Sequence, residues 1–204
     1  MEKKLNMRQI QHKATLEAIR SAVDKMVDSV GFDAMTIRDI CKEVDITVGT
    51  FYHYFSSKNE LLKDRYIRSN EHFQTFYEEN LVSMDELEAL RLFFDHYFEY
   101  SSTRVYQLYK RFMQVRIDEY EKWASTDPDL IRGIILEIIQ NGQKHGRIRS
   151  DRSAEDMAEF INMLLQGFTT TYVTYDREAP GRTGIIKIIT ECIDSLGAGN
   201  SKGK

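Results

Sequence analysis

The fold is decided by the stretch from residue 36 to residue 55, which reads Thr36-Ile-Arg-Asp-Ile-Cys-Lys-Glu-Val-Asp-Ile-Thr-Val-Gly-Thr-Phe-Tyr-His-Tyr-Phe55. Apolar residues at helical spacing predict one short helix after Thr36 and another from about Thr47 to Tyr54, joined by a turn at residues 45–46. These are the dimensions of a helix-turn-helix. Because the second helix is too short to be stable alone, packing must hold it. The residues expected to face inward are Ile37, Ile40, Cys41, Val44, Phe51 and Phe55.

The opposite face of the second short helix carries no carboxylate. Its side chains are small, hydroxyl-bearing or aromatic, namely Thr47, Val48, Thr50, Tyr52 and His53. Such a face can approach phosphates and thymine methyl groups without like-charge repulsion. Gly49 removes side-chain bulk where the backbone would come closest to a duplex. Lys58 can add a phosphate contact, and so can Thr36 through its hydroxyl and the exposed N–H groups of the helix that it caps. These residues predict a DNA-binding surface.

Composition limits the class of protein. The chain has 204 residues, a formal net charge of −4 and 42% hydrophobic residues, which is typical of a globular protein. Two prolines and 11 glycines are too few for the many tight turns of an all-β fold. Neither a secretory signal nor a membrane-spanning apolar run is present, and the two cysteines, Cys41 and Cys192, lie far apart. We expect a cytoplasmic protein without metal or cofactor, in which Cys41 is a small core residue.

Helical periodicity continues along the rest of the chain and predicts an all-α fold of about nine helices. A capping box at residues 57–60 opens a long fourth helix. We expect a three-helix DNA-binding domain at residues 1–56, a helical effector-binding and dimerisation domain at residues 57–198, and a flexible tail at residues 199–204.

Several short motifs keep a common register across residues 8–65. They are Gly31-Phe32, Met35-Thr36-Ile37-Arg38-Asp39-Ile40, Val48-Gly49-Thr50-Phe51-Tyr52-His53-Tyr54-Phe55, and Lys58 with Glu60-Leu61-Leu62. Together they resemble the DNA-binding domain of the tetracycline-repressor (TetR) family of bacterial regulators. Cys41 and Thr47 depart from the commonest residues of that family at their positions, alanine and serine, but both are small. The later helices resemble the family in their order alone.

The resemblance implies roles for particular residues. Those implied to face the major groove or its flanking phosphates are Arg38, Thr47, Val48, Gly49, Thr50, Tyr52 and His53. Those implied to hold the DNA backbone are Thr36, Tyr52 and Lys58. Two alternatives stay open: Tyr54 either contacts DNA or braces the short helix against the first helix, and His53 either contacts DNA or is simply solvated.

Aromatic residues are concentrated in the middle of the chain, where 13 of the 23 lie between Phe73 and Trp123. They form either an aromatic core or the wall of a cavity for a flat or apolar small molecule. In the TetR family the helices at this place enclose an effector pocket. The residues expected to line it are Phe94, Tyr97, Tyr109, Met113 and Gln166.

The last two expected helices are apolar enough to need a partner surface, which predicts a two-fold symmetric homodimer. The residues expected at its interface are Phe160, Leu164, Gly167, Phe168, Ile185, Ile189 and Ile193. Two recognition helices related by this symmetry predict an inverted-repeat operator in double-stranded DNA.

The function expected from these features is a homodimeric, ligand-responsive transcriptional regulator, most simply a repressor, that responds to a small apolar or aromatic effector. The alternative is a constitutive helical DNA- or partner-binding protein without an effector pocket. An enzyme is not expected, because the sequence lacks the motifs of zinc proteases, of hydrolase nucleophiles and of phosphate-binding loops.

Overall fold

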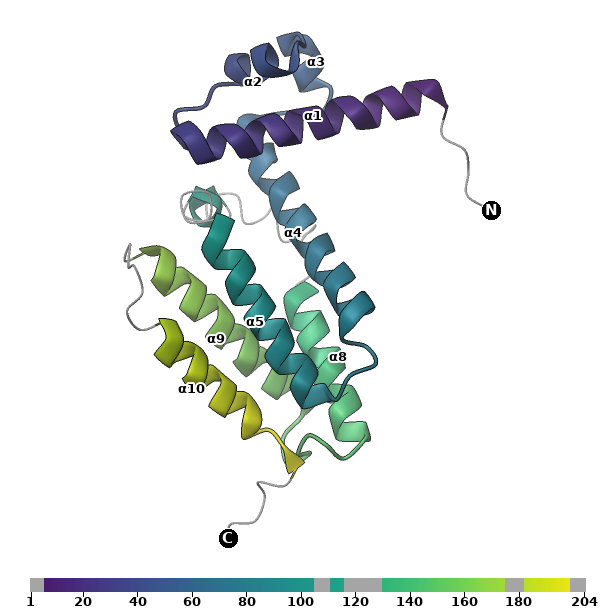
Figure 1. Cartoon of the computed structure of the whole chain (residues 1–204), viewed down its shortest axis with the longest axis vertical. Coiled ribbons are helices and arrows are strands. Elements are labelled where there is room, and N and C mark those ends of the chain that lie inside the picture. Colours follow the sequence, from purple (N-terminus) through teal and green to yellow (C-terminus); the bar gives the residue numbers. More distant parts are fainter. Residues whose placement is uncertain (1–5, 105–110, 116–129, 175–181, 199–204) are drawn as a thin grey trace. The chain divides into compact units, whose positions relative to one another are not determined.

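The computed structural model describes residues 6–104, 111–115, 130–174 and 182–198 of the chain. Its helices include α1 (Met7–Val30), α2 (Ile37–Val44), α3 (Val48–Tyr52), α4 (Lys58–Asn80), α5 (Glu86–Arg104), α8 (Leu130–Lys144), α9 (Ala154–Thr174) and α10 (Arg182–Asp194) (Figure 1). Residues 111–115 are helical as well. Over this described part of the chain, the β-pairing is limited to one isolated bridge, and the expected all-α class is confirmed. None of the described helices is long and apolar enough to cross a membrane.

The chain forms two compact units, and the division falls inside α4. The first unit contains residues 1–67 and 107–118, and the second contains residues 68–106 and 119–204. The sequence places the division at the start of α4, whereas the first half of this helix packs with the preceding three. That residues 1–56 form a domain by themselves therefore stays a prediction.

Ion pairs fasten α4 to α1 within the first unit. The Arg20 guanidinium donates to both carboxylate oxygens of Asp64, at 3.2 and 3.0 Å from Nε. Arg65 on α4 pairs with Asp24 on α1. These side chains are partly shielded from water, and bidentate pairs of this kind fix orientation as well as distance. The first half of α4 is consequently part of the rigid body that carries α2 and α3.

The second unit is built around the aliphatic and aromatic faces of α5, α8, α9 and α10, which run alongside one another in Figure 1. Leu90 and Phe93 of α5, Ile135 and Ile139 of α8 and Ile161 of α9 are completely buried there. Burying side chains of this size contributes about 1.5–3 kcal/mol each. The aromatic residues of this region are therefore largely core.

A polar cluster closes the end of the second unit. The carboxylate of Glu86, in the first turn of α5, is buried and accepts hydrogen bonds from His145 Nδ1 at 2.6 Å and from an Arg147 nitrogen at 2.9 Å. Burial alone would raise the pKa of Glu86, but the hydrogen bonds from His145 and Arg147 lower it on balance. The cluster joins α5 to the loop between α8 and α9.

That loop is also held by close backbone packing. Ile148 forms the isolated bridge with Gly197, and its N–H donates to the carbonyl of Gly142 on α8 at 3.0 Å. A Cβ at Gly142 would lie 2.6–3.1 Å from three side-chain atoms of Ile148. Only a residue without a side chain lets the loop return this closely over the helix.

Candidate nucleic-acid interface

The short helix α2 is defined at both ends by local hydrogen bonding. At its start, the Thr36 Oγ1 accepts from the Asp39 N–H at 3.2 Å, and the Thr36 N–H donates to the Asp39 carboxylate at 3.1 Å. The sequence predicts that Thr36 caps this helix, and the structure shows that the cap is a reciprocal capping box with Asp39. At its end, Asp45 adopts the left-handed conformation, with φ of 56°. Aspartate tolerates this conformation better than most residues, and it turns the chain sharply toward α3.

Helix α3 is held by capping at its start and by aromatic packing behind it. The Thr47 Oγ1 accepts the Thr50 N–H at 3.0 Å and lies 2.9 Å from the Thr50 hydroxyl. Phe51 is completely buried and Phe55 nearly so, with ring centroids 5.7 Å apart. Because the His53 N–H bonds the Thr50 carbonyl three residues back, the helix tightens into a turn after Tyr52, two residues earlier than expected.

The predicted recognition face of α3 is exposed, as the sequence led us to expect. Val48 and Tyr52 retain 39% and 53% of their accessible surface, and Thr47, Gly49 and His53 are also exposed. Thr50 is half-buried, and Arg38 is exposed on α2. The face has room to admit another molecule, and its residues contain no carboxylate.

The Thr36 hydroxyl, which is predicted to contact a phosphate, already has a partner within the protein. The hydroxyl donates to the Asp39 carboxylate at 2.6 Å, so its proton is already used within the cap. This hydrogen bond lowers the pKa of Asp39, which therefore stands as an anion at the start of α2. The cap was expected from the sequence, but the negative charge that it places beside the interface was not.

Lys58 is likewise not a free surface lysine. Its ammonium donates to the backbone carbonyl of Asp33 at 3.1 Å and lies 4.7 Å from the centre of the Phe32 ring. Burial lowers its pKa, with the nearby Arg111 acting in the same direction and Asp33 opposing it. Lys58 ties the start of α4 to the loop between α1 and α2. One of its three N–H groups is used there, which leaves two for a phosphate.

Tyr54 packs against α1. Its ring centroid lies 4.6 Å from that of His12, with the planes tilted by 34°. Of the two alternatives for Tyr54, the structure therefore shows the bracing contact. His53 is exposed at the end of α3, which is compatible with either of its alternatives.

A segment distant in sequence joins the first unit, which was not expected from the sequence. Arg111 pairs with the Asp33 carboxylate at 3.4 Å in the loop between α1 and α2, and Phe112 stacks on Tyr66 of α4 at 4.8 Å between centroids. The helical spacing of this segment was visible, but no sequence signal connects it to residues almost eighty positions earlier.

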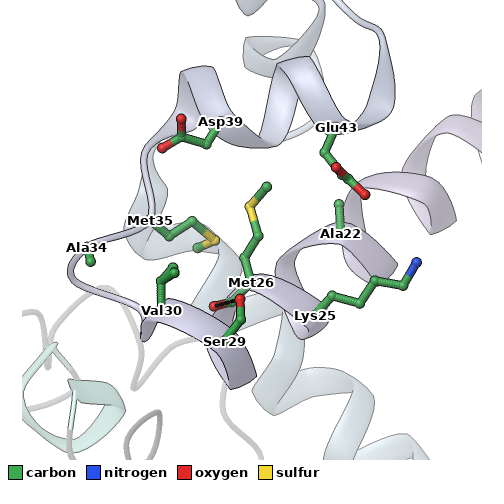
Figure 2. Close-up of a pocket in the computed structure, with 9 residues that line it drawn as sticks. All are labelled: Ala22, Lys25, Met26, Ser29, Val30, Ala34, Met35, Asp39 and Glu43. Atoms are coloured by element: carbon green, nitrogen blue, oxygen red, sulfur yellow. Dashed lines mark hydrogen bonds between the residues drawn. The ribbon is translucent and has the colours of Figure 1, made fainter.

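The surface between α1 and α2 is hollowed into an open pocket of about 470 Å³. Figure 2 shows the methionines Met26 and Met35 at its centre and Lys25 and Glu43 at its edge. Asp39, already used in the cap of α2, lines the same pocket. The described residues contain no group of three metal-ligating side chains, and Cys41 is buried in the core as expected.

Two of the predicted effector-contacting residues lie in quite different environments. Phe94 is 3% exposed and is part of the second unit's core, where its ring centroid lies 6.0 Å from that of Phe98. Gln166 is exposed on the surface of α9. In this structure Phe94 is therefore a core residue and Gln166 a surface residue, and their place in an effector site stays a prediction.

The other predicted effector contacts are partly described. Tyr97 is half-buried on α5, and its hydroxyl lies 3.3 Å from the hydroxyl of Thr169 on α9. Met113 is half-buried in the first compact unit. Tyr109 lies outside the described residues. Tyr97 thus has the partner that a shielded phenol needs.

The residues predicted for a dimer interface divide into two groups. Phe160 and Gly167 are exposed and Leu164 and Phe168 half-buried on α9. Ile189 and Ile193 of α10 instead lie in the protomer's own core, 5% and 0% exposed. These two are corrected to core residues, because α10 turns them toward the second unit's interior. The side chain of Ile185 is outside the described part of the chain.

Exposed apolar residues that were not predicted from the sequence lie on the same two helices. Met163 of α9 is 60% exposed and Ile188 of α10 is 59% exposed. Each is adjacent in sequence to a residue predicted for the interface. On α10, most of whose surface is apolar, the spacing of apolar residues could not distinguish the face that packs inward from the face that is exposed.

A capped α2, a sharp turn and an aromatically anchored α3 with a hydroxyl-rich exposed face define a helix-turn-helix DNA-binding protein. Residues 13–64 match the family model of bacterial regulatory proteins of the tetR family. Over these residues the chain has the helix-turn-helix region of a TetR-family regulator. Members of the family are regulators rather than enzymes.

Solved structures with the same fold extend the likeness over nearly the whole chain. GusR of Salmonella enterica has a TM-score of 0.69 at 19% identity, covering 95% of this chain and 98% of its own. FadR of Thermus thermophilus, a TetR-family repressor solved with lauroyl-CoA, has a TM-score of 0.65 at 19% identity, covering 93% and 96%. A TetR-family regulator of Pseudomonas syringae pv. tomato has 0.62 at 18%, covering 89% and 95%. Among curated proteins, none is similar enough in sequence to be a recognisable relative.

Proposed function

We propose that the protein is a homodimeric, ligand-responsive transcriptional repressor that acts in the cytoplasm on an inverted-repeat operator. The observation that carries this proposal is the exposed face of α3, on which Val48, Tyr52 and His53 stand clear of the protein with no carboxylate among them. In the major groove, Val48 can contact thymine methyl groups, and Tyr52 and the threonine hydroxyls can reach phosphates or base edges. Arg38 on α2 supplies a cation for the flanking backbone.

Dimerisation is supported by exposed apolar side chains on the last two helices. Phe160, Met163 and Ile188 each retain more than half of their accessible surface. Exposed apolar side chains of this size are typical of protein interaction surfaces, and a two-fold dimer would cover them with the same residues of a second copy. The exposed Gly167 would allow close approach of the two copies of α9.

An effector site in the second unit is supported by its chemistry. Tyr97 and Thr169 place paired hydroxyl groups beside the aromatic residues Phe73 and Phe98. FadR of Thermus thermophilus, which shares the fold, was solved with lauroyl-CoA. An apolar or aromatic effector of this chain would exchange core aromatic contacts for contacts with itself, with Tyr97 fixing its orientation.

Effector binding would reach DNA through two chain segments. Helix α4 passes from one compact unit to the other, and so does the chain on either side of residues 111–115. A shift of α4 would move α2 and α3 with it, because Arg20 and Asp64 fasten it to α1. A coupling of about 1–3 kcal/mol, or 5- to 150-fold in DNA affinity, would be sufficient for regulation.

The DNA-binding assignment can be tested with an operator selected by the protein from a pool of random duplexes. Tyr52→Ala and Val48→Ala should weaken operator binding about 5- to 100-fold, equivalent to about 1–3 kcal/mol. Val82→Ala, which truncates another exposed apolar residue, is the matched control and should bind as the wild type does. Lys58→Ala is unsuitable, because it also removes the bond to the Asp33 carbonyl. Wild-type affinity in both α3 variants would refute the assignment.

The burial of Phe94 and Phe98 also supports the alternative function, a constitutive DNA-binding protein whose aromatic residues are all core. Thermal-shift measurements with lauroyl-CoA and with small aromatic compounds distinguish the two. A stabilising compound that also releases operator DNA supports regulation by an effector. Absence of any shift across such a set, with operator binding intact, supports the constitutive protein.

A further inference from the structure

Helix α1 carries a basic side chain on the stripe that forms the core of the first unit further along the helix. Successive helical residues rotate by about 100°, so Arg8 and His12 lie on the same side of α1 as Ile19 and Val23. Ile19 and Val23 are 0% and 4% exposed, whereas Arg8 and His12 are exposed. Figure 1 shows why: the N-terminal turns of α1 continue past α3. The stripe that is buried at Ile19 and Val23 is therefore exposed in the N-terminal turns of α1, which extend past α3.

The contact between His12 and Tyr54 places the exposed part of this stripe next to the end of α3. Their rings lie 4.6 Å apart, and Tyr54 follows directly after the exposed residues Tyr52 and His53 at the end of α3. Arg8 lies one helical turn, about 6 Å, beyond His12 on the same face of α1. Arg8 is thus on the same side of α1 as the residue that contacts Tyr54 at the end of α3.

The charge of these turns suits a phosphate partner. From Met7 to Leu16 the helix contains Arg8 and Lys13 but no carboxylate, and its first turn has no acidic residue. A basic residue in the first turn of a helix is disfavoured by the helix dipole, which prefers anions there. The capping box uses Asn6 and Gln9, whose side chains each accept the backbone N–H of the other at 2.9 Å. The capping box therefore does not involve Arg8, and a bound anion would offset the unfavourable position of its charge in the first turn.

We propose that the N-terminal turns of α1 form a second DNA-binding surface, in which Arg8 binds the phosphate backbone beside the groove that α3 enters. This rests on the proposed function, since it needs α3 to be in the groove. A guanidinium can bind a phosphate with two parallel hydrogen bonds, and such a contact adds affinity without reading sequence. The surface would extend the contact made by each DNA-binding head along the backbone.

Lys25 provides a matched control on the same helix. It is exposed and lies on the other side of α1, where it lines the pocket shown in Figure 2. Arg8→Gln and Lys25→Gln therefore remove the same charge from the same helix, but only Arg8→Gln removes it from the stripe that continues past α3. Neither side chain is part of the core, so both variants should keep the wild-type melting temperature.

The experiment measures the salt dependence of binding to a fluorescein-labelled, mixed-sequence 30-base-pair duplex between 50 and 200 mM NaCl. Removing one cation that neutralises a phosphate should reduce the slope of log K against log salt by about 0.9. When NaCl is raised from 50 to 200 mM, the wild type should lose DNA affinity by a factor about 3.5 times larger than the factor lost by Arg8→Gln, for each DNA-bound head. Lys25→Gln should keep the wild-type slope, and Arg8→Lys should restore most of it because it restores the charge.

The possible results separate this inference from the proposed function. An unchanged slope in Arg8→Gln, or an equal reduction in Lys25→Gln, overturns the α1 surface while wild-type binding and the Tyr52→Ala defect still support DNA binding by α3. If the wild type binds neither this duplex nor a selected operator, the proposed function fails and the α1 surface fails with it. A reduced slope in Arg8→Gln alone establishes the contact.

Discussion

Replacing Gly142 by alanine tests whether the loop after α8 is packed as tightly as the structure shows. The new Cβ would lie 2.6 and 2.7 Å from Ile148 Cδ1 and Cγ1 and 3.1 Å from its Cβ. Turning the side chain cannot relieve the last contact, because Ile148 is held in place by the bridge to Gly197 and by its own hydrogen bond to Gly142. The clash must be relieved by moving the loop or the helix.

The magnitude follows from two opposing effects. Alanine in a helix interior is favoured over glycine by about 1 kcal/mol. Overpacking a well-filled core costs about 1–3 kcal/mol. Gly133, also in α8, has no atom within 4 Å of where its Cβ would be, so Gly133→Ala should show the favourable effect alone. The two variants should therefore differ in unfolding free energy by about 1–3 kcal/mol, with Gly142→Ala the less stable.

Thermal unfolding of the full chain, followed by circular dichroism, measures this difference. For a chain of this size, 1 kcal/mol corresponds to about 2–4 °C in Tm. Gly133→Ala should raise Tm by a few degrees, and Gly142→Ala should lower it or leave it close to that of the wild type. In an Ile148→Ala background most of the penalty at Gly142 should disappear, since Cδ1 and Cγ1 are gone and only the 3.1 Å contact with Cβ remains. Equal increases in Tm for both alanine variants would refute the packing described for this loop.

Three further outcomes are expected. The folded-state pKa of Glu86 lies below its ordinary value of 4.5. The ionised carboxylate therefore stabilises the folded protein fully above pH 4.5, and this stabilisation declines as the pH falls below 4.5. Glu86→Gln should make Tm less dependent on pH in this acidic range. Phe160→Glu should shift the chain toward monomer in analytical ultracentrifugation and weaken operator binding, whereas Val82→Glu, at a comparably exposed site, should leave both unchanged. Thr36→Ala removes the cap of α2 and should lower unfolding free energy by about 1 kcal/mol, measured by urea denaturation; wild-type stability in this variant would contradict the capping role.

Local signals in the sequence were sufficient to predict the helix-turn-helix. The capping box at Thr36 and the aromatic anchor at Phe51 act over a few residues, so spacing alone reveals them. Contacts made by long-range packing have no such local signal. Lys58 as a phosphate ligand stays a prediction, but its bond to the Asp33 carbonyl, 25 residues away, could not be predicted from the sequence. The attachment of Arg111 to the loop at Asp33 has no local sequence signal at all.

The dimer and effector residues were harder to predict for a related reason. Helix α10 is apolar on most of its circumference, so periodicity could not tell that Ile189 and Ile193 face inward while Ile188 faces out. An error of one residue rotates a helical position by about 100°, which is enough to exchange core and surface. On α3, by contrast, five residues with one buried phenylalanine leave a single consistent orientation.

The ion pairs between α1 and α4 have a mechanical consequence. Helix α4 contains 23 residues and is therefore about 34 Å long. Because its first half is fixed to the DNA-binding head, a tilt of only about 5° at the far end would swing that head by about 3 Å, a displacement comparable to the spacing of neighbouring base pairs. A modest disturbance among distant side chains would thus be magnified by leverage, and a head that no longer matched the pitch of the duplex would dissociate.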